Sequence, residues 1–170
     1  MDFDDIVITK HYNYYKLSKK NSEKIIIDTI KLFSPFGVEY YKNKYILNLE
    51  LSVVSTNNEE YNFVALLKQI DYFFRTCAND YLKKIVGNRE YCSFLKNSKV
   101  NDKIIIRMHL LKKGKQIETI FDKQMNGELV NIFIDDIKLS SGLCKVVLDH
   151  IYMTNNKYGV TLYLIKYTMV

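Results

Sequence analysis

Tyrosine and lysine side chains alternate in several short stretches of this 170-residue sequence. The clearest stretch is residues 40–45, which read YYKNKY. Aromatic faces can stack on nucleobases while lysines contact phosphates, and proteins that bind single-stranded nucleic acid use this pairing. Because every base has a π-face, such stacking accepts any base. The pattern therefore predicts a surface that binds a ligand with flat groups and negative charge.

Four segments carry this pattern: residues 11–16, residues 40–45, the strand and turn around 107–115, and the last hairpin, 152–166. From the last three we take the candidate nucleic-acid-binding residues, which are Tyr40, Tyr41, Lys42, Lys44, Arg107, Lys112, Lys113, Lys115, Tyr152, Lys157 and Tyr158. A structural explanation competes at each site, because tyrosine is a strong strand former and a lysine-rich turn can be a solvated tip. Taken singly, each site fits the structural explanation better.

Arg107 is the most informative candidate, since it is one of three arginines and lies between Ile106 and Met108. Side chains alternate across a strand, so Arg107 should face away from the core. From that face a guanidinium group can contact a phosphate or stack on a base.

Catalytic constellations are missing from the sequence. The three histidines lie in separate segments, at His11, His109 and His150. No phosphate-binding glycine loop or nucleophile elbow is found. Asp135 and Asp136 could be interpreted as the magnesium site of a nuclease, but neighbouring residues of a strand point to opposite faces. We therefore predict a protein that is not an enzyme, with no catalytic residue, no metal site and no cofactor.

The bulk composition indicates a basic globular protein. The net charge is +6 and aromatic residues make up 14 % of the chain, which favours a polyanionic partner. An A/T-rich genome would also enrich lysine, asparagine, isoleucine and tyrosine, so composition bias is an alternative explanation. Three widely spaced cysteines suggest neither disulfides nor zinc and favour an intracellular location. No secretory leader or membrane-spanning run is recognised, so secretion and membrane insertion are not expected.

The elements that must position these residues are mostly strands. A helix with an apolar 3.6-residue period is expected over 59–77, capped by Thr56 or Asn57, and it continues or restarts before Gly87. Glycine and asparagine residues indicate the turns between the strands. The expected strands are 25–33, 38–55, 103–111, 116–121, 129–139, 143–153 and 159–169, with turns at 34–37, 112–115 and 154–159. We predict a mainly β fold, α+β by content: one domain, 1–170, that forms a small barrel or sandwich with an amphipathic helix inserted between strands.

Several blocks in this order resemble a known family. They are SPFGVEYYKNKYILNLEL, FVALLKQIDYFF, KIIIRMHLLKKGK and LCKVVLDHIYMTNNKYGVTLYLIKYTMV. Together they are similar to the OB-fold single-stranded DNA-binding proteins of large double-stranded DNA viruses, which resemble phage replication single-stranded DNA-binding proteins. The resemblance implies an OB-like fold, a five-stranded barrel with an intervening helix and extra strands. It also implies sequence-independent binding of single-stranded DNA during replication, recombination or repair. The phage proteins typically end in an acidic tail, whereas residues 163–170 resemble a strand, so recruitment through such a tail is not expected.

The sequence thus predicts an intracellular single-stranded DNA-binding protein, acting in the cytoplasm or at a viral replication site. RNA is left open as a ligand, as are replication proteins and a second copy of the chain as partners. The alternative is a non-enzymatic structural or protein-interaction module from a virus with an A/T-rich genome. A continuous positive groove lined by tyrosines would favour DNA binding, and scattered lysines would favour the alternative.

Overall fold

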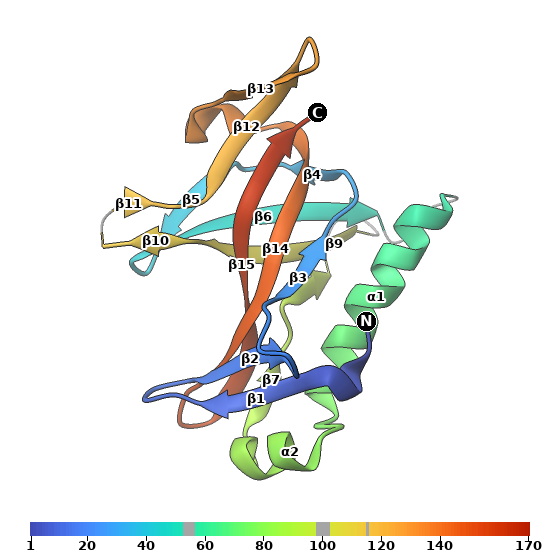
Figure 1. The fold of residues 1–170 in the computed structure, drawn as a ribbon, viewed down its shortest axis with the longest axis vertical. Helices are drawn as coiled ribbons and strands as arrows, with labels where there is room; N and C mark the ends of the chain where they lie inside the picture. Colours follow the sequence, from blue (N-terminus) through green and yellow to red (C-terminus); the bar gives the residue numbers. More distant parts are fainter. Residues whose placement is uncertain (53–56, 98–102, 115) are drawn as a thin grey trace.

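A computed structural model describes residues 1–52, 57–97, 103–114 and 116–170, and strands dominate it (Figure 1). The strands that precede the helices are β1 (Ile6–Lys10), β2 (Tyr15–Lys19), β3 (Ile25–Asp28), β4 (Leu32–Ser34), β5 (Val38–Tyr41) and β6 (Lys44–Ser52). The helices are α1 (Asn58–Arg75) and α2 (Asp80–Val86). The strands that follow are β7 (Glu90–Cys92), β8 (Leu95–Asn97), β9 (Lys103–Leu110), β10 (Lys112–Lys113), β11 (Gln116–Ile117), β12 (Ile120–Met125), β13 (Glu128–Asn131), β14 (Ser140–Met153) and β15 (Lys157–Met169).

Five of these strands close into a barrel. β4 pairs with β6, β6 pairs with β9, and β9 pairs in parallel with β15. β15 then pairs with β14, and β14 pairs with β4, which closes the ring. A five-stranded barrel with α1 inserted between β6 and β9 confirms the predicted OB-like fold class.

The long hairpin of β14 and β15 forms the spine of the molecule, in orange and red in Figure 1. Its inward side chains belong to one apolar cluster that also includes residues from β6, β9 and α1. On β9 burial alternates strictly, so Ile106 and Met108 are buried while Arg107 lies on the outer face. The predicted last hairpin and the predicted orientation of Arg107 are confirmed.

Both helices begin after an asparagine cap, and α2 ends at the predicted stop, Gly87. The side chain of Asn57 accepts a hydrogen bond of 2.9 Å from the backbone N–H of Glu59 at the start of α1. Asn79 caps α2 in the same way, and Gly87, with φ of 57°, ends it. The apolar stripe of α1 packs into the core, as its period predicted. The alternative cap, Thr56, lies outside the described residues.

The predicted strand over 38–55 is wrong in one respect, because the chain turns back within it. Lys42 and Asn43 both have positive φ, 48° and 64°, which is the signature of a type I′ turn between β5 and β6. The predicted strand over 25–33 is likewise divided into β3 and β4. The expected turn glycine of the 112–115 turn, Gly114, has φ of 60° and joins the short strands β10 and β11.

The predicted strand over 129–139 is also wrong in its second half. After β13 the chain forms the 3₁₀ helix η2 (Ile134–Ile137), which buries Ile137 in the core. Asp135 and Asp136 are exposed there, and Asp136 accepts a hydrogen bond from the backbone N–H of Phe133. The second strand of the N-terminal hairpin, β2, and the short strands β7 and β8 were not predicted. In the part of the chain described, no helix is long and apolar enough to cross a bilayer.

Candidate nucleic-acid interface

A pocket of about 640 Å³ lies on the outer face of β6 and β9. The β5–β6 turn borders it on one side, the β14–β15 hairpin on another, and β7 and β8 supply a wall. Its lining residues are Tyr41, Lys42, Lys44, Ile46, Cys92, Ser93, Phe94, Lys96, Arg107, His109, Tyr152, Val160 and Thr161. OB folds bind oligonucleotides at this place, on the face of barrel strands 2 and 3 and the loops between strands 1 and 2 and between 4 and 5. Counted around the barrel of this protein, those parts are β6 and β9, the segment of the β5–β6 hairpin, and the β14–β15 turn.

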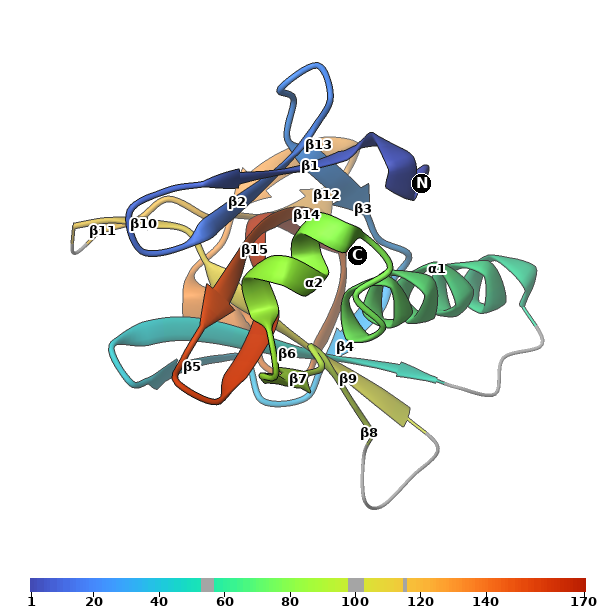
Figure 2. The ribbon, with the colours of Figure 1, turned by 90° about the horizontal axis from the view of Figure 1, so that it is seen from below.

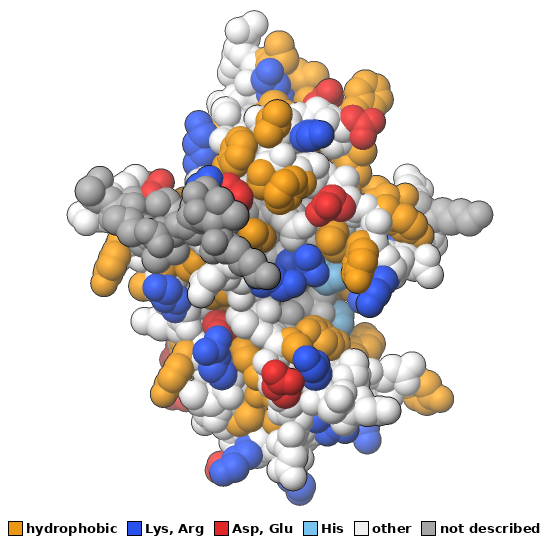
Figure 3. Space-filling model, turned by 180° about the vertical axis from the view of Figure 1, so that it is seen from behind, with side chains coloured by type: hydrophobic (Ala, Val, Ile, Leu, Met, Phe, Trp, Pro, Cys, Tyr) orange, Lys and Arg blue, Asp and Glu red, His pale blue; other side chains and the backbone are white. Residues whose placement is uncertain are grey.

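Four cations line the pocket: Lys42, Lys44, Lys96 and Arg107. None of them forms an ion pair with any residue in the described ranges, whereas Lys103 and Lys157 elsewhere on the surface pair with glutamates. The face around the pocket is hollowed, with lysine and arginine on both sides of pale-blue histidine atoms (Figure 3). A phosphate backbone would meet these four charges without displacing a carboxylate.

Arg107 is held in position by a chain of polar contacts across three strands. Its Nε donates to Asn48 Oδ1 at 3.2 Å, and Asn48 Nδ2 donates to Glu39 Oε2 at 2.6 Å. Asn48 and Arg107 are direct cross-strand partners on β6 and β9, so their side chains share the outer face. The contact uses one of the five guanidinium N–H donors and fixes the plane of the group.

Aromatic rings form the walls of the pocket. Tyr41 is 54 % exposed and Tyr152 is 36 % exposed, so both present ring surface to solvent. The Lys42 ammonium lies 5.2 Å from the centroid of the Tyr41 ring, which places a cation beside a stacking surface. Burial and the neighbouring Cys92 raise the pKa of Tyr152, so its phenol stays protonated.

The absence of a side chain at Gly159 leaves the space that the Tyr152 ring occupies. The two residues are cross-strand partners on β14 and β15. A Cβ on Gly159 would stand 2.5 Å from Tyr152 Oη and 2.7 Å from the carbonyl oxygen of Cys92 on β7. The tyrosine ring therefore lies across a position where any side chain would collide with it.

His109 lies at the floor of the pocket and is neutral at physiological pH. Burial, together with the nearby charges of Lys44 and Arg107, lowers its pKa from 6.5 to about 4. Its Nδ1 is buried and has no hydrogen-bond partner among the described residues. A neutral imidazole has one N–H donor and one acceptor nitrogen, so His109 adds no positive charge to the pocket.

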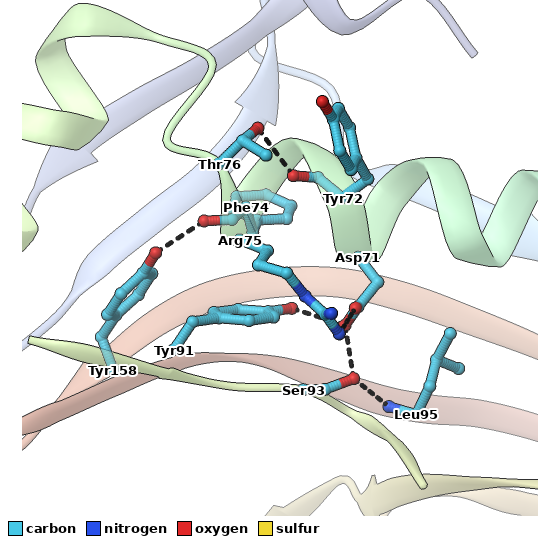
Figure 4. A network of polar contacts seen from close by, with 9 residues as sticks. All are labelled: Asp71, Tyr72, Phe74, Arg75, Thr76, Tyr91, Ser93, Leu95 and Tyr158. Atoms are coloured by element: carbon cyan, nitrogen blue, oxygen red, sulfur yellow. Dashed lines mark hydrogen bonds and ion pairs between the residues drawn. The ribbon is translucent and has the colours of Figure 1, made fainter. Parts of the chain in front are cut away.

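A buried carboxylate ties the pocket wall to α1 (Figure 4). Asp71, 5 % exposed, accepts hydrogen bonds from Tyr91 Oη at 2.9 Å, Ser93 Oγ at 2.5 Å and Arg75 Nη2 at 2.7 Å. Burial and the Asp71 carboxylate raise the pKa of Tyr91 above its usual range, so the phenol remains a donor. The β7–β8 segment that carries Cys92, Ser93 and Phe94 is thereby fixed against the helix.

The structure brings five of the predicted residues together as pocket lining, from three segments far apart in the sequence. These are Tyr41, Lys42, Lys44, Arg107 and Tyr152. Lys112 lies at the rim, where its Nζ donates to the backbone carbonyl of Asn43 at 3.0 Å. The role of these residues in binding stays a prediction.

Three other predicted residues in the described ranges do not line the pocket. The ring centroid of Tyr40 lies 4.9 Å from that of Tyr45. Lys113 lines a separate hollow beside β11 and β12. Lys157 forms an ion pair, with its Nζ 3.4 Å from Glu90 Oε2. The predicted residue Lys115 lies outside the described residues.

Tyr158 requires a correction. It is 2 % exposed, and its Oη donates to the Phe74 carbonyl at the end of α1 at 2.7 Å. A ring enclosed in the core presents no face to a base, so the prediction that Tyr158 contacts nucleic acid is wrong. Its bulk instead joins the start of β15 to the helix.

Sequence reasoning missed His109, Lys96 and Phe94 in the pocket lining. His109 could have been found, because it lies two residues beyond Arg107 on the same strand and so on the same face. Lys96 and Phe94 belong to the short β7–β8 segment, which has no periodic pattern to predict it. No cluster of three or more acidic, histidine or cysteine side chains that could hold a metal occurs in the described ranges.

Solved structures match this chain in fold. No protein-family model matches it, and no curated protein matches its sequence. A single-stranded DNA-binding protein from bacteriophage Enc34, in complex with single-stranded DNA, matches with a TM-score of 0.58 and 8 % identity over 98 % of this chain and 96 % of that chain. Its C-terminally truncated form matches with a TM-score of 0.56 and 10 % identity, over 98 % and 95 % of the two chains.

The single-stranded DNA-binding protein gp2.5 of bacteriophage T7 also matches, with a TM-score of 0.56 and 13 % identity over 86 % of each chain. The chain therefore has the fold of phage single-stranded DNA-binding proteins. That part of the resemblance stated from the sequence is confirmed, while the part that names large double-stranded DNA viruses stays a prediction.

Proposed function

We propose that this protein binds single-stranded DNA without sequence preference, and that it has no catalytic activity. In this proposal the bases enter the pocket on β6 and β9 and stack on Tyr41 and Tyr152. The phosphates contact the four cations of the pocket, Lys42, Lys44, Lys96 and Arg107. The protein would act in replication, recombination or repair, inside the cell.

The observation that carries the proposal is the coincidence of three properties at one place. The pocket occupies the part of an OB-like barrel that such folds use for oligonucleotides. It holds four cations without ion-pair partners among the described residues, and it has exposed aromatic walls. A solved structure of the same fold is a complex with single-stranded DNA, which supports the same class of ligand here.

The alternative of a protein-interaction module fits this surface less well. Composition bias alone would scatter lysines and pair many of them with acids, as at Lys103 and Glu50. It does not account for four cations gathered around aromatic side chains in one pocket with no ion pair to any residue of the described ranges. Single-stranded RNA has the same stacking and phosphate chemistry, so the binding assay includes it as a competitor.

The test is a fluorescence anisotropy titration with labelled oligo(dT), a mixed-sequence oligonucleotide and a duplex of the same length. We expect similar affinities for the two single strands and weaker binding of the duplex. With four phosphate contacts, log K should fall with log salt at a slope of about −2.8, because each contact on a single strand contributes about −0.7. Between about 50 and 200 mM salt this amounts to roughly a 50-fold loss of affinity.

Single variants sharpen this test. Lys44→Ala should make the salt slope shallower by about 0.7, because one phosphate contact is removed. The matched control is Lys68→Ala, an exposed lysine on α1 that does not line the pocket, which should leave the slope unchanged. Absence of binding at low salt, or tighter binding of the duplex, would overturn the proposed function.

A further inference from the structure

A row of aromatic rings leads out of the pocket toward the N-terminal hairpin. It begins at His109 in the pocket, whose ring centroid lies 6.1 Å from that of Tyr163. The row continues from Tyr163 to His150 at 5.8 Å and from His150 to Tyr14 at 5.2 Å. It ends with His11 stacked on Tyr14 at 5.1 Å and an interplanar angle of 4°. Thus all three histidines of the chain belong to one contiguous row.

The row crosses four elements and leaves the part of the barrel that OB folds use. His109 is on β9, Tyr163 on β15 and His150 on β14, and the last two rings belong to the β1–β2 hairpin. That hairpin is not part of the closed ring of five strands, and β2 pairs with β14 at two positions. Figures 1 and 2 both show its tip on the same side of the molecule as the tip of the β5–β6 hairpin.

Exposure increases toward the far end of the row. Tyr163 and His150 are half-buried, Tyr14 is 39 % exposed, and His11 at the end of the row is exposed. Near the barrel the rings are partly covered by neighbouring residues. The tip instead offers aromatic faces to solvent and so to a ligand.

Positive charge accompanies the row. Lys16 is the direct cross-strand partner of His150, so its exposed side chain lies on the same face as the row. It forms no ion pair within the described ranges. One acid, Asp149, lies beside the row, and its Oδ2 is engaged by His150 Nδ1 at 2.8 Å. His150 Nε2 contacts Thr161 Oγ1 at 3.2 Å, and Thr161 lines the pocket, so row and pocket are joined by a polar contact as well.

We infer that the nucleic-acid path does not end at the pocket but continues along this row to the β1–β2 hairpin. There Tyr14 and His11 stack on bases and Lys16 contacts a phosphate. This inference rests on the proposed function, because it assigns a second subsite to the same single-stranded ligand. It makes the N-terminal hairpin a determinant of how many nucleotides the protein covers.

The test compares oligo(dT) of two lengths, about 4 and about 16 nucleotides, which span the range of site sizes of OB folds. A short strand fills the pocket, whereas a long one reaches the hairpin. Tyr14→Ala should lower the affinity for the long strand by about 5- to 150-fold, which corresponds to the loss of one stacked base. It should leave the affinity for the short strand unchanged.

Controls separate this inference from packing and from the proposed function itself. Tyr14→Phe keeps the ring and should bind both lengths as the wild type does. Tyr72→Ala removes a 66 % exposed tyrosine on α1 and should change neither affinity. Arg107→Ala should weaken both lengths, and His11→Ala provides a second variant at the exposed tip that cannot disturb the core.

Outcomes differ for the two proposals. If Arg107→Ala weakens binding while Tyr14→Ala and His11→Ala bind the long strand normally, the second subsite is wrong and the proposed function stands. Equal losses on both lengths, with a lower melting temperature, would show that Tyr14 only supports the fold and would also overturn the inference. If the wild type binds neither strand, the proposed function fails, and the second subsite fails with it.

Discussion

Replacing Gly159 by alanine tests how the pocket wall is built. The new Cβ would stand 2.5 Å from Tyr152 Oη and 2.7 Å from Tyr152 Cζ, and both distances are shorter than side-chain atoms tolerate. The tyrosine can rotate away, but the Cys92 carbonyl, also at 2.7 Å, belongs to the backbone of β7. Tyr152 should therefore leave the pocket wall, and β7 should shift.

The size of the effect follows from these two displacements. Loss of one stacked base costs about 1–3 kcal/mol, which corresponds to an affinity about 5- to 150-fold lower. Forcing an extra methyl group into a packed site typically destabilises a protein by about 1–3 kcal/mol. The salt slope should not change, because the substitution removes no cation. Anisotropy titrations and urea unfolding measure the two effects separately.

A double-mutant cycle with Tyr152→Ala isolates the mechanism. In the Tyr152→Ala background two of the three close atoms are gone, so Gly159→Ala should cost less stability and no further affinity. Gly127→Ala is the matched control: its added Cβ meets no atom within 4 Å, so affinity should be kept although its φ of 85° strains the turn. A folded Gly159→Ala protein that binds as tightly as the wild type would refute the reasoning.

Two further predictions concern buried polar groups. The pKa of His109 is lowered from 6.5 to about 4, so between these values the unfolded chain binds more protons, and stability should fall as the pH drops through this window. Urea unfolding of His109→Phe should lack this part of the pH dependence, and an identical profile would contradict it. Asp71→Asn should lower stability by about 1–3 kcal/mol, because buried donors lose their charged acceptor. It should also speed hydrogen exchange over residues 91–97, and unchanged exchange there would show that Asp71 does not hold the pocket wall.

The sequence predicts those features whose signal is local. The apolar period of α1 and the alternation along β9 each extend over enough residues to identify the secondary structure and the side that faces the core. The outward position of Arg107 on β9 was therefore predictable. The β5–β6 turn was not predicted. Its first central residue, Lys42, has positive φ but is not one of the residue types, such as glycine or asparagine, that usually indicate a positive φ in a sequence. β7 and β8 have three residues each, too few for any period to be recognised.

The pocket itself was predictable only in part, because its lining is assembled from distant segments. Tyr41, Arg107 and Tyr152 meet through strand pairings that no local pattern specifies. Tyr158 is a tyrosine next to a lysine in the sequence, as Tyr41 is, yet its ring is buried between β15 and α1. Tyrosine has an apolar ring and a polar tip, so residue type alone does not separate these two environments.

The central position of β15 has a consequence for how the chain reaches its native state. This last strand pairs in parallel with β7, β9 and β12 and in antiparallel fashion with β14. Pairings between residues far apart in sequence form slowly, because loop-closure entropy is lost before the contacts compensate for it. The barrel, and with it the wall that carries Val160 and Thr161, can close only after β15 has docked. A nascent chain that lacks this strand therefore has most of the lining residues but no pocket, and the binding surface should arise in the same cooperative step as the fold.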